Sequence, residues 1–207
     1  MKLRGIVCFL ALLLTTQYAA AQDYTIETLA EPAPADEISE SIAAELAPEG
    51  YRVLRKGKPY LDVWFEKSIP AKEDFSPTLA ILYPFEQGKL FGVIRYHRSA
   101  GDFRDQEIEE GVYTLRYALQ PVDGNHVGTS DTRDFLLLSL ADDDTEADPV
   151  DGEELNLRSA DAAQSAHPCM LSFLRTPDDA TAEPKMLHDE DRDLWSIQVP
   201  VNTTAGD

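Results

Sequence analysis

The stretch "GVYTLRYAL", residues 111–119, alternates apolar and polar side chains with a period of two. In a β-strand, residues two apart share one face, so four apolar side chains would lie together: Tyr113, Leu115, Tyr117 and Leu119. A helix, with its period of about 3.6 residues, would scatter them around its surface. The stretch therefore predicts a strand with one buried face, and its polar face carries Thr114 and Arg116.

Strand-like segments with turn residues between them flank this stretch on both sides. The run "FLLLSLA" (135–141) is apolar throughout, as expected of a strand covered on both faces. Other strands are predicted at 51–55, 60–66, 79–83, 89–96, 169–174 and 194–201. This succession predicts an all-β fold, a two-sheet antiparallel sandwich of immunoglobulin or transthyretin type with one or two short peripheral helices. Its expected core consists of Leu61, Val63, Phe65, Val93, Leu115, Leu119, Leu137 and Phe173.

The two helices are predicted outside the strands. Residues 36–46 place three aliphatic side chains four apart, which gives one apolar stripe on a helix that Asp36 caps. A second helix is expected at 154–166, inside an acidic insertion at 141–167. It ends before Pro168, because the residue that precedes a proline disfavours helical geometry.

The first 21 residues have the pattern of a secretory signal peptide. Lys2 and Arg4 provide a positive start, an apolar run follows at 5–14, and small residues at 19–21 form the cleavage site. The run is too short to cross a bilayer, and no later segment reaches the roughly 20 apolar residues that a membrane helix needs. The sequence therefore predicts an exported protein, periplasmic or secreted, without a membrane span.

The chain that remains after cleavage is long enough for one domain. We expect residues 22–35 to be a mobile arm, 36–201 to form a single β-sandwich domain, and 202–207 to be a disordered tail. Cys169 is the one cysteine beyond the signal peptide, so no internal disulfide can form. Its place at the head of an apolar run predicts that it is buried.

Acidic residues dominate the composition. The chain has 38 Asp and Glu against 18 Lys and Arg, a formal net charge of −20, yet residues 51–140 are almost neutral, with 13 acids and 12 bases. Nucleic acid and anionic membranes are poor partners for such a surface, because both require positive charge. We expect the acidic flanks to be solvated; the alternative is that they bind cations or dock on basic residues of the centre.

A connection of fourteen residues, 120–133, joins two predicted strands. Loops of that length without secondary structure are usually functional or disordered, and this one holds hydrogen-bonding side chains and glycines that permit tight turns. We expect an ordered loop at one end of the fold, where loops often carry binding surfaces. Its predicted binding residues are Asn125, His126, Ser130 and Arg133.

No catalytic residue is predicted. Ser130, His126 and Asp131 are the residue types of a hydrolase triad, but the serine lacks the "GxSxG" turn that exposes such a nucleophile. Cys169 follows His167 by two residues, a spacing that permits a contact on one strand face. Neither set supplies the further groups that nucleophilic catalysis needs.

Metal binding is the alternative that the residue types leave open. A calcium loop starting at Asp123 is matched only in part, because Val127 stands where an oxygen ligand is needed. His126, His167 and His188, with nearby carboxylates, are the candidate ligands of a transition metal, although their spacing forms no known metal motif. We therefore expect no cofactor, with a divalent metal as the alternative.

The segment "GVYTLRYALQPVDGNHVGTSDTRDFLLL" (111–138), preceded by "DFRDQEIEEG" (102–111), resembles a group of uncharacterised exported bacterial proteins. The resemblance extends over residues 48–200 and includes "AHP" and "HDEDRDLW". It implies export and a β-sandwich, and it brings no activity, substrate or cofactor.

Two functions follow from these patterns. The first is an exported, non-enzymatic β-sandwich module that binds a small ligand or a protein partner in the cell envelope. The second is a metal-dependent enzyme or metal-handling protein that uses the three histidines named above. Because the sequence assembles neither a nucleophile nor a metal motif, it favours the first.

Overall fold

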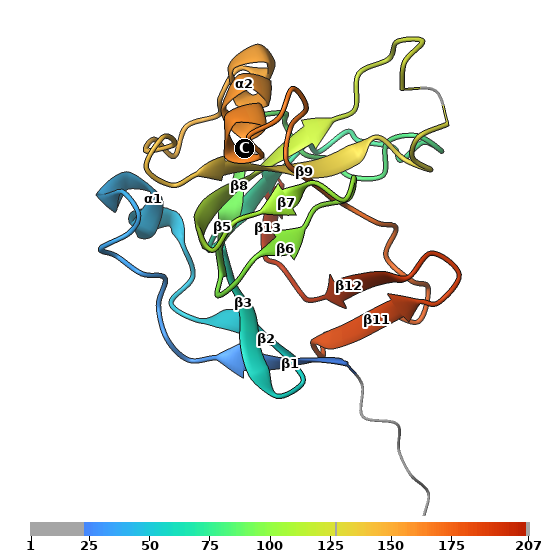
Figure 1. Cartoon of the computed structure of the whole chain (residues 1–207). Helices are drawn as coiled ribbons and strands as arrows, with labels where there is room; N and C mark the ends of the chain where they lie inside the picture. The colour runs from blue at the N-terminus through green and yellow to red at the C-terminus, as the bar shows by residue number, and fades with distance from the viewer. Residues whose placement is uncertain (1–22, 127, 206–207) are drawn as a thin grey trace, which may run out of the picture.

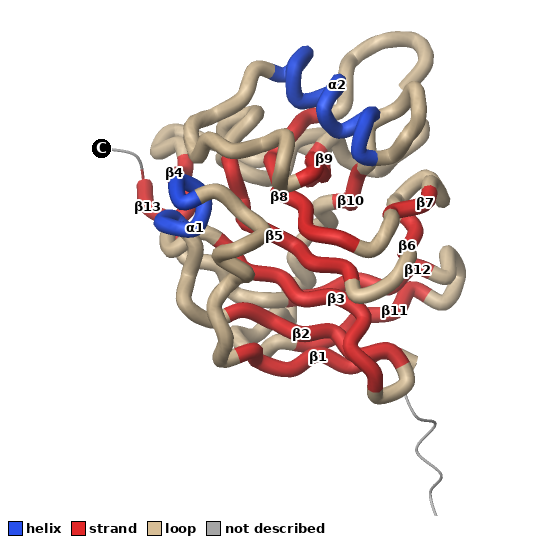
Figure 2. The backbone as a smooth tube through the Cα atoms, turned by 60° about the vertical axis from the view of Figure 1, so that its left-hand side comes forward, coloured by secondary structure: helices blue, strands red, loops and turns tan. Residues whose placement is uncertain are grey.

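An antiparallel sheet of seven strands dominates the computed structural model, which describes residues 23–126 and 128–205. Figure 2 shows most of these strands side by side, from β1 at the bottom to β9 near the top. In spatial order they are β1 (Tyr24–Leu29), β2 (Gly50–Arg55), β3 (Lys58–Phe65), β5 (Leu90–Tyr96), β8 (Gly111–Leu119), β9 (Asp134–Leu140) and β10 (Met170–Ser172). The strand predicted at 111–119 is thus confirmed, with β5 and β9 as its neighbours.

Short strand pairs and two helices surround this sheet (Figure 1). The pairs are β11 (Lys185–Asp189) with β12 (Leu194–Gln198), β6 (Ala100–Gly101) with β7 (Glu107–Ile108), and β4 (Ile69–Ala71) with β13 (Thr203–Ala205). The helices are α1 (Glu40–Glu45) and α2 (Gly152–Ala162). A mostly β fold with two short helices is therefore confirmed. A two-sheet sandwich is not confirmed, because only two-stranded sheets accompany the large one in the described residues.

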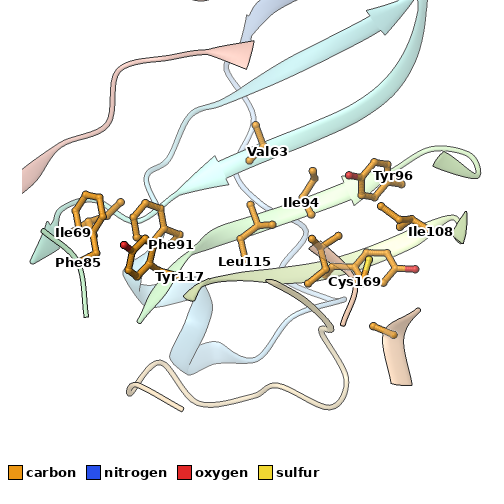
Figure 3. Close-up of a cluster of buried hydrophobic side chains, with 13 residues drawn as sticks. Val63, Ile69, Phe85, Phe91, Ile94, Tyr96, Ile108, Leu115, Tyr117 and Cys169 are labelled. Atoms are coloured by element: carbon orange, nitrogen blue, oxygen red, sulfur yellow. The ribbon is translucent and has the colours of Figure 1, made fainter. Parts of the chain in front are cut away.

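One face of the large sheet carries the main buried cluster (Figure 3). Val63 and Leu115 lie in it together with the aromatic rings of Phe85, Phe91 and Tyr117. The rings of Phe85 and Phe91 meet edge to face, with centroids 4.7 Å apart. Edge-to-face pairs of this kind contribute attraction beyond the burial of their area.

The opposite face is covered by the helices. Trp64 and Val93 pack against Ile42 of α1, and Leu137 packs against Leu155 of α2. The sheet is thus buried on both faces, which explains why strands such as β5 and β9 are apolar along most of their length.

The predicted core is confirmed for half of its members. Four are buried, namely Val63, Val93, Leu115 and Leu137. The other four are half-buried: Leu61, Phe65, Leu119 and Phe173. The buried four lie on both faces of one sheet, rather than between two large sheets.

Arg116 fastens the acidic segment before α2 to the sheet. Its guanidinium is fully buried, and Nε and Nη2 donate to the two carboxylate oxygens of Asp144 at 2.6 and 2.9 Å. The remaining donors reach the backbone carbonyls of Gly88, Glu146 and Asp148, so all five N–H groups are satisfied. The acidic stretch 144–148 therefore docks on a basic residue of the central region 51–140. This agrees with the second of the two expectations for the acidic flanks.

Both ends of the described chain were expected to be mobile or disordered, and both contain residues paired in strands. Residues 24–29, expected in a mobile arm, form β1 and pair with β2 along their whole length. The β-branched residues Thr25, Ile26 and Thr28 favour an extended backbone. Residues 203–205, expected in a disordered tail, pair with β4.

The strand predicted at 79–83 is wrong, since this segment is irregular. The backbone N–H groups of Leu82 and Tyr83 donate to the side chain of Asp134, instead of to a neighbouring strand. Pro84, which has no N–H to donate, follows directly. A short apolar run alone does not distinguish a strand from a covered irregular segment.

Both helices are shorter than expected. α1 begins after Ser39, whose Oγ accepts from the N–H of Ile42, so Asp36 is not its cap. α2 ends at Ala162, before the expected end at residue 166, and Gln164 follows with a positive φ of 48°.

The predicted signal peptide lies outside the described residues. Among the residues that the structure describes, no helix is long and apolar enough to cross a membrane.

Candidate functional site

Loops gather at two ends of the large sheet. The loop end consists of segments 72–88 and 120–133, where β8 ends and β9 begins. The hairpin end consists of the β2–β3 turn at 56–57, the end of β5 and the start of β8, which the antiparallel registers bring together. A cavity lies at each end.

The loop-end cavity has a volume of about 190 Å³. Three of the predicted binding residues, His126, Ser130 and Arg133, are among its lining residues. Asn125 lies in the same loop but does not line the cavity. The structure therefore brings three of the four residues together, while their role in binding stays a prediction.

Asp123 organises the turn that presents His126. Its Oδ1 lies 2.7 Å from Nδ1 of His126 and accepts the backbone N–H of Asn125 at 2.9 Å. The bond with His126 is the main cause that lowers the pKa of Asp123. One carboxylate thus shapes the turn and orients the imidazole ring.

Asp134, at the start of β9, joins the two loops of this end. Its carboxylate is fully buried and accepts from the N–H of Leu82 at 2.9 Å and from the hydroxyl of Tyr117 at 2.6 Å. Burial, followed by this bond with Asp134, raises the pKa of Tyr117. The backbone N–H of Arg133 also donates to the carbonyl of Ala80 at 2.7 Å. The loops are therefore fixed relative to each other and to the sheet.

Two large aliphatic side chains project from these fixed loops. Leu79 is 89% exposed and Val122 is 82% exposed, more than any other large hydrophobic residue in the described part of the chain. Val122 and Ala80, the neighbour of Leu79, both line the cavity. The loop end thus combines apolar tips with a small polar cavity.

Ser130, His126 and Asp131, which have the residue types of a hydrolase triad, are not joined by hydrogen bonds in the order that a triad requires. His126 is bonded to Asp123, and the carboxylate of Asp131 instead meets Arg192 at 2.9 Å. No hydrogen bond joins the hydroxyl of Ser130 to His126 within residues 23–126 and 128–205.

The three histidines of the metal alternative belong to different elements. His126 lies in the 120–133 loop, and His167 is exposed after the end of α2. His188 lies on β11, where its ring stacks on Trp195 with centroids 4.1 Å apart. In the described ranges, no three His, Cys, Asp or Glu residues are arranged so that they could hold a metal ion.

Cys169 is fully buried, which confirms the prediction from its apolar run. Burial raises the pKa of its thiol to about 12. The neutral thiol is a poor nucleophile, and the neighbouring His167 is exposed.

The cavity at the hairpin end is larger, with a volume of about 550 Å³. Its lining includes Arg95 near the end of β5, His97 just after that strand, Glu110 from the turn before β8, and Glu37 from the segment before α1. His97 is not among the residues predicted from the sequence. One signal was present, since Arg95 and His97 are two apart, a spacing that places two side chains on one face of an extended segment.

A buried carboxylate holds His97 in place. The side chain of Asp62 is 1% exposed, and both of its oxygens accept from Arg52 at 2.7 Å. Nε2 of His97 lies 2.9 Å from Oδ2 of the same carboxylate. Burial alone would raise the pKa of Asp62, but the hydrogen bonds from Arg52 and His97 outweigh it and hold this pKa below its ordinary value. Asp62 is therefore a carboxylate that orients an imidazole ring.

Comparisons with known proteins identify no protein similar to this chain. No protein-family model matches the chain, and searches of curated proteins and of solved structures find no match either. The resemblance of 111–138 to exported bacterial proteins consequently stays a prediction.

Proposed function

We propose that the protein is an exported, non-enzymatic binding module that contacts a protein partner in the cell envelope through its loop end. The observation that carries this proposal is the pair of exposed aliphatic side chains, Leu79 and Val122, on loops that a buried Asp134 holds in place. Apolar side chains around a few polar groups form the centre of many protein interfaces. Preorganised loops lose little conformational freedom on binding, which favours affinity.

The size of the loop-end cavity supports a macromolecular partner. Small-molecule sites typically have volumes of about 300–1,000 Å³, whereas this cavity has about 190 Å³. It suits a single side chain of a partner. Arg133 uses Nε to bond the carbonyl of Gln120, and its two Nη groups have no hydrogen-bond partner in the described part of the chain. An acidic side chain of the partner would suit these donors, since the two carboxylates that also line the cavity, Asp123 and Asp131, are engaged by His126 and Arg192.

The residues considered as catalytic groups support binding rather than catalysis. His126 and Asp131 are each engaged by another residue, and the thiol of Cys169 is buried and neutral. No observation favours the metal-dependent alternative, because its three histidines lie in separate elements. Export rests on the signal-peptide pattern of residues 1–21.

Photo-crosslinking in the producing cells tests this proposal. A photoreactive benzoyl-phenylalanine replaces Val122, and in a matched control it replaces Leu157, which is 64% exposed on α2. We expect one discrete, light-dependent product of higher mass from position 122 and none from position 157. The product should disappear when Leu79→Asp is added.

Two results would overturn the proposal: no product from position 122, or the same products from both positions. Export is checked separately by cell fractionation and N-terminal sequencing, with Gln22 as the expected first residue.

A further inference from the structure

The hairpin-end cavity presents charges of both signs from separate elements. Arg95 comes from the end of β5, Glu110 from the turn that precedes β8, and Glu37 from the segment before α1. The cavity volume of about 550 Å³ lies inside the range of about 300–1,000 Å³ that small-molecule sites occupy. This end of the sheet therefore differs in kind from the loop end.

Several polar groups in this cavity retain unused hydrogen-bonding capacity. Arg95 donates to Glu37 through Nη2, and its Nε and Nη1 have no hydrogen-bond partner within the described ranges. The carboxylate of Glu110 has neither an ion-pair nor a hydrogen-bond partner among the residues that the structure describes. His97 has its Nε2 held by Asp62, which leaves Nδ1 as its free ring nitrogen.

From this arrangement we propose that the cavity binds a small zwitterion, namely a free amino acid or a short peptide. The ligand carboxylate accepts from N–H groups of Arg95 that Glu37 leaves unused, and such charge-assisted bonds are stronger than those between neutral groups. The ligand ammonium pairs with Glu110, and Nδ1 of His97 is a further acceptor at the same wall. Asp62 and Arg52 do not contact the ligand, and they act by fixing the orientation of the His97 ring.

The charges of the protein favour a ligand with both signs over one with a single sign. A pure anion would approach a chain of net charge −20 and meet Glu37 and Glu110 at the cavity. A pure cation would be attracted by the net charge and by the two carboxylates, but it would leave the unused N–H groups of Arg95 without an acceptor. A zwitterion has no net charge to be repelled at long range, and it can satisfy Arg95 and Glu110 together. This inference goes beyond the proposed function, since it concerns the other end of the sheet and needs no protein partner.

Isothermal titration calorimetry of the purified protein tests the inference with glycylglycine as the zwitterionic probe. Two analogues each remove one charge: N-acetylglycylglycine lacks the ammonium, and glycylglycinamide lacks the carboxylate. We expect saturable binding of glycylglycine, and at least tenfold weaker binding of each analogue. Equal affinity for glycylglycine and either analogue, or no saturable binding of glycylglycine, would overturn the inference.

Matched variants locate the binding. Arg95→Gln and Glu110→Gln should each weaken glycylglycine at least tenfold, and Glu110 is exposed, so that its replacement leaves the fold intact. Arg175→Gln and Glu73→Gln make the same charge changes at exposed positions outside the cavity, and they should leave the affinity unchanged. If the control variants weaken binding as much as the cavity variants, the inference is wrong. Crosslinking from position 122 does not involve this cavity, so failure of one test leaves the other proposal standing.

Discussion

The two ends of the large sheet each contain a buried carboxylate, and the donors that meet it differ. At the loop end, Asp134 accepts from neutral donors, two backbone N–H groups and the hydroxyl of Tyr117. At the hairpin end, Asp62 accepts from the guanidinium of Arg52 and the ring of His97. Neutral backbone donors fix the course of a loop, whereas side-chain donors fix the orientation of a polar group that faces a cavity.

This difference agrees with the surfaces that the two carboxylates support. The loop end has exposed aliphatic tips and a cavity of about 190 Å³, and the hairpin end has charged groups around about 550 Å³. We propose that the first contacts a protein partner and that the second takes a small zwitterion. If this division of roles holds, changes at one end leave binding at the other end intact, and loss of either carboxylate destabilises the region around it.

Asp134→Ala should give the largest loss of stability. The change leaves three donors without their acceptor, two of them buried and one partly buried. An unsatisfied buried donor costs about 1–3 kcal/mol, so we expect a loss of about 3 kcal/mol or more in urea denaturation. Amide exchange should accelerate at residues 79–83, because Leu82 and Tyr83 lose their acceptor. Asp134→Asn keeps one acceptor oxygen and should lose less. A loss below about 1 kcal/mol for Asp134→Ala would contradict the anchoring role.

Asp62→Asn should give a smaller loss, about 2 kcal/mol, because bonds to charged groups are worth about 1.5–3 kcal/mol and Arg52 is partly exposed. The difference from the wild type should depend on pH. The folded pKa of Asp62 lies below the ordinary value of 3.8, so its stabilising effect is complete above the unfolded pKa and is lost as the pH falls through the folded pKa.

Urea denaturation at several pH values checks this dependence. The difference in free energy of unfolding between wild type and Asp62→Asn should be present in full at pH 5, about one unit above the unfolded pKa, and should shrink below about pH 4. A difference that grows as the pH falls from 4 to 3 would show that Asp62 is not a stabilising carboxylate.

Added salt should raise the melting temperature of the whole protein modestly, because it acts on the net charge and not on one end of the sheet. The net charge of −20 opposes the compact state by self-repulsion, and salt at about 0.15 M shortens the screening length to about 8 Å. We expect the melting temperature to rise by about 2–4 °C, the shift that about 1 kcal/mol produces in a chain of this size. An unchanged or lower melting temperature would mean that the loss of exposed ion pairs such as Arg192–Asp131, which salt screens, outweighs the relief of repulsion.

Leu79→Ser should have the smallest effect on stability. Leu79 is 89% exposed, and surface changes of this kind usually stay within about 0.5 kcal/mol. The same variant should nevertheless reduce crosslinking from position 122, while leaving the affinity for glycylglycine unchanged. A large loss of stability would mean that Leu79 supports the fold, and the reduced crosslinking could then not be assigned to the interface.

The sequence predicts the fold where one pattern dominates. Strict alternation at 111–119 and the long apolar run at 135–141 both give the strands expected, β8 and β9. Prediction fails where tertiary contacts decide the outcome. Segment 79–83 has strand-like composition, yet a side chain 52 residues away from Leu82 captures its N–H. β1 is missed because the prolines that follow it indicate a mobile arm.

The two candidate sites also differ in how far the sequence predicts them. The loop end is predictable in part, because the length and polar content of one continuous segment, 120–133, indicate an ordered loop. The hairpin end is not, because Arg52 and Asp62 come from two strands and His97 directly follows a third, so that they meet only through the β2–β3 and β3–β5 registers. Sequence spacing shows which residues share a strand face, and it does not show which strands are neighbours.

The most direct test of a division of roles between the two ends is one titration of the isotope-labelled protein with glycylglycine, followed by amide NMR. We predict saturable shifts at Arg95, His97 and Gly111, with no shifts at residues 79–80 and 120–133. Shifts confined to the loop end, or saturable shifts of similar size at both ends, would contradict the account.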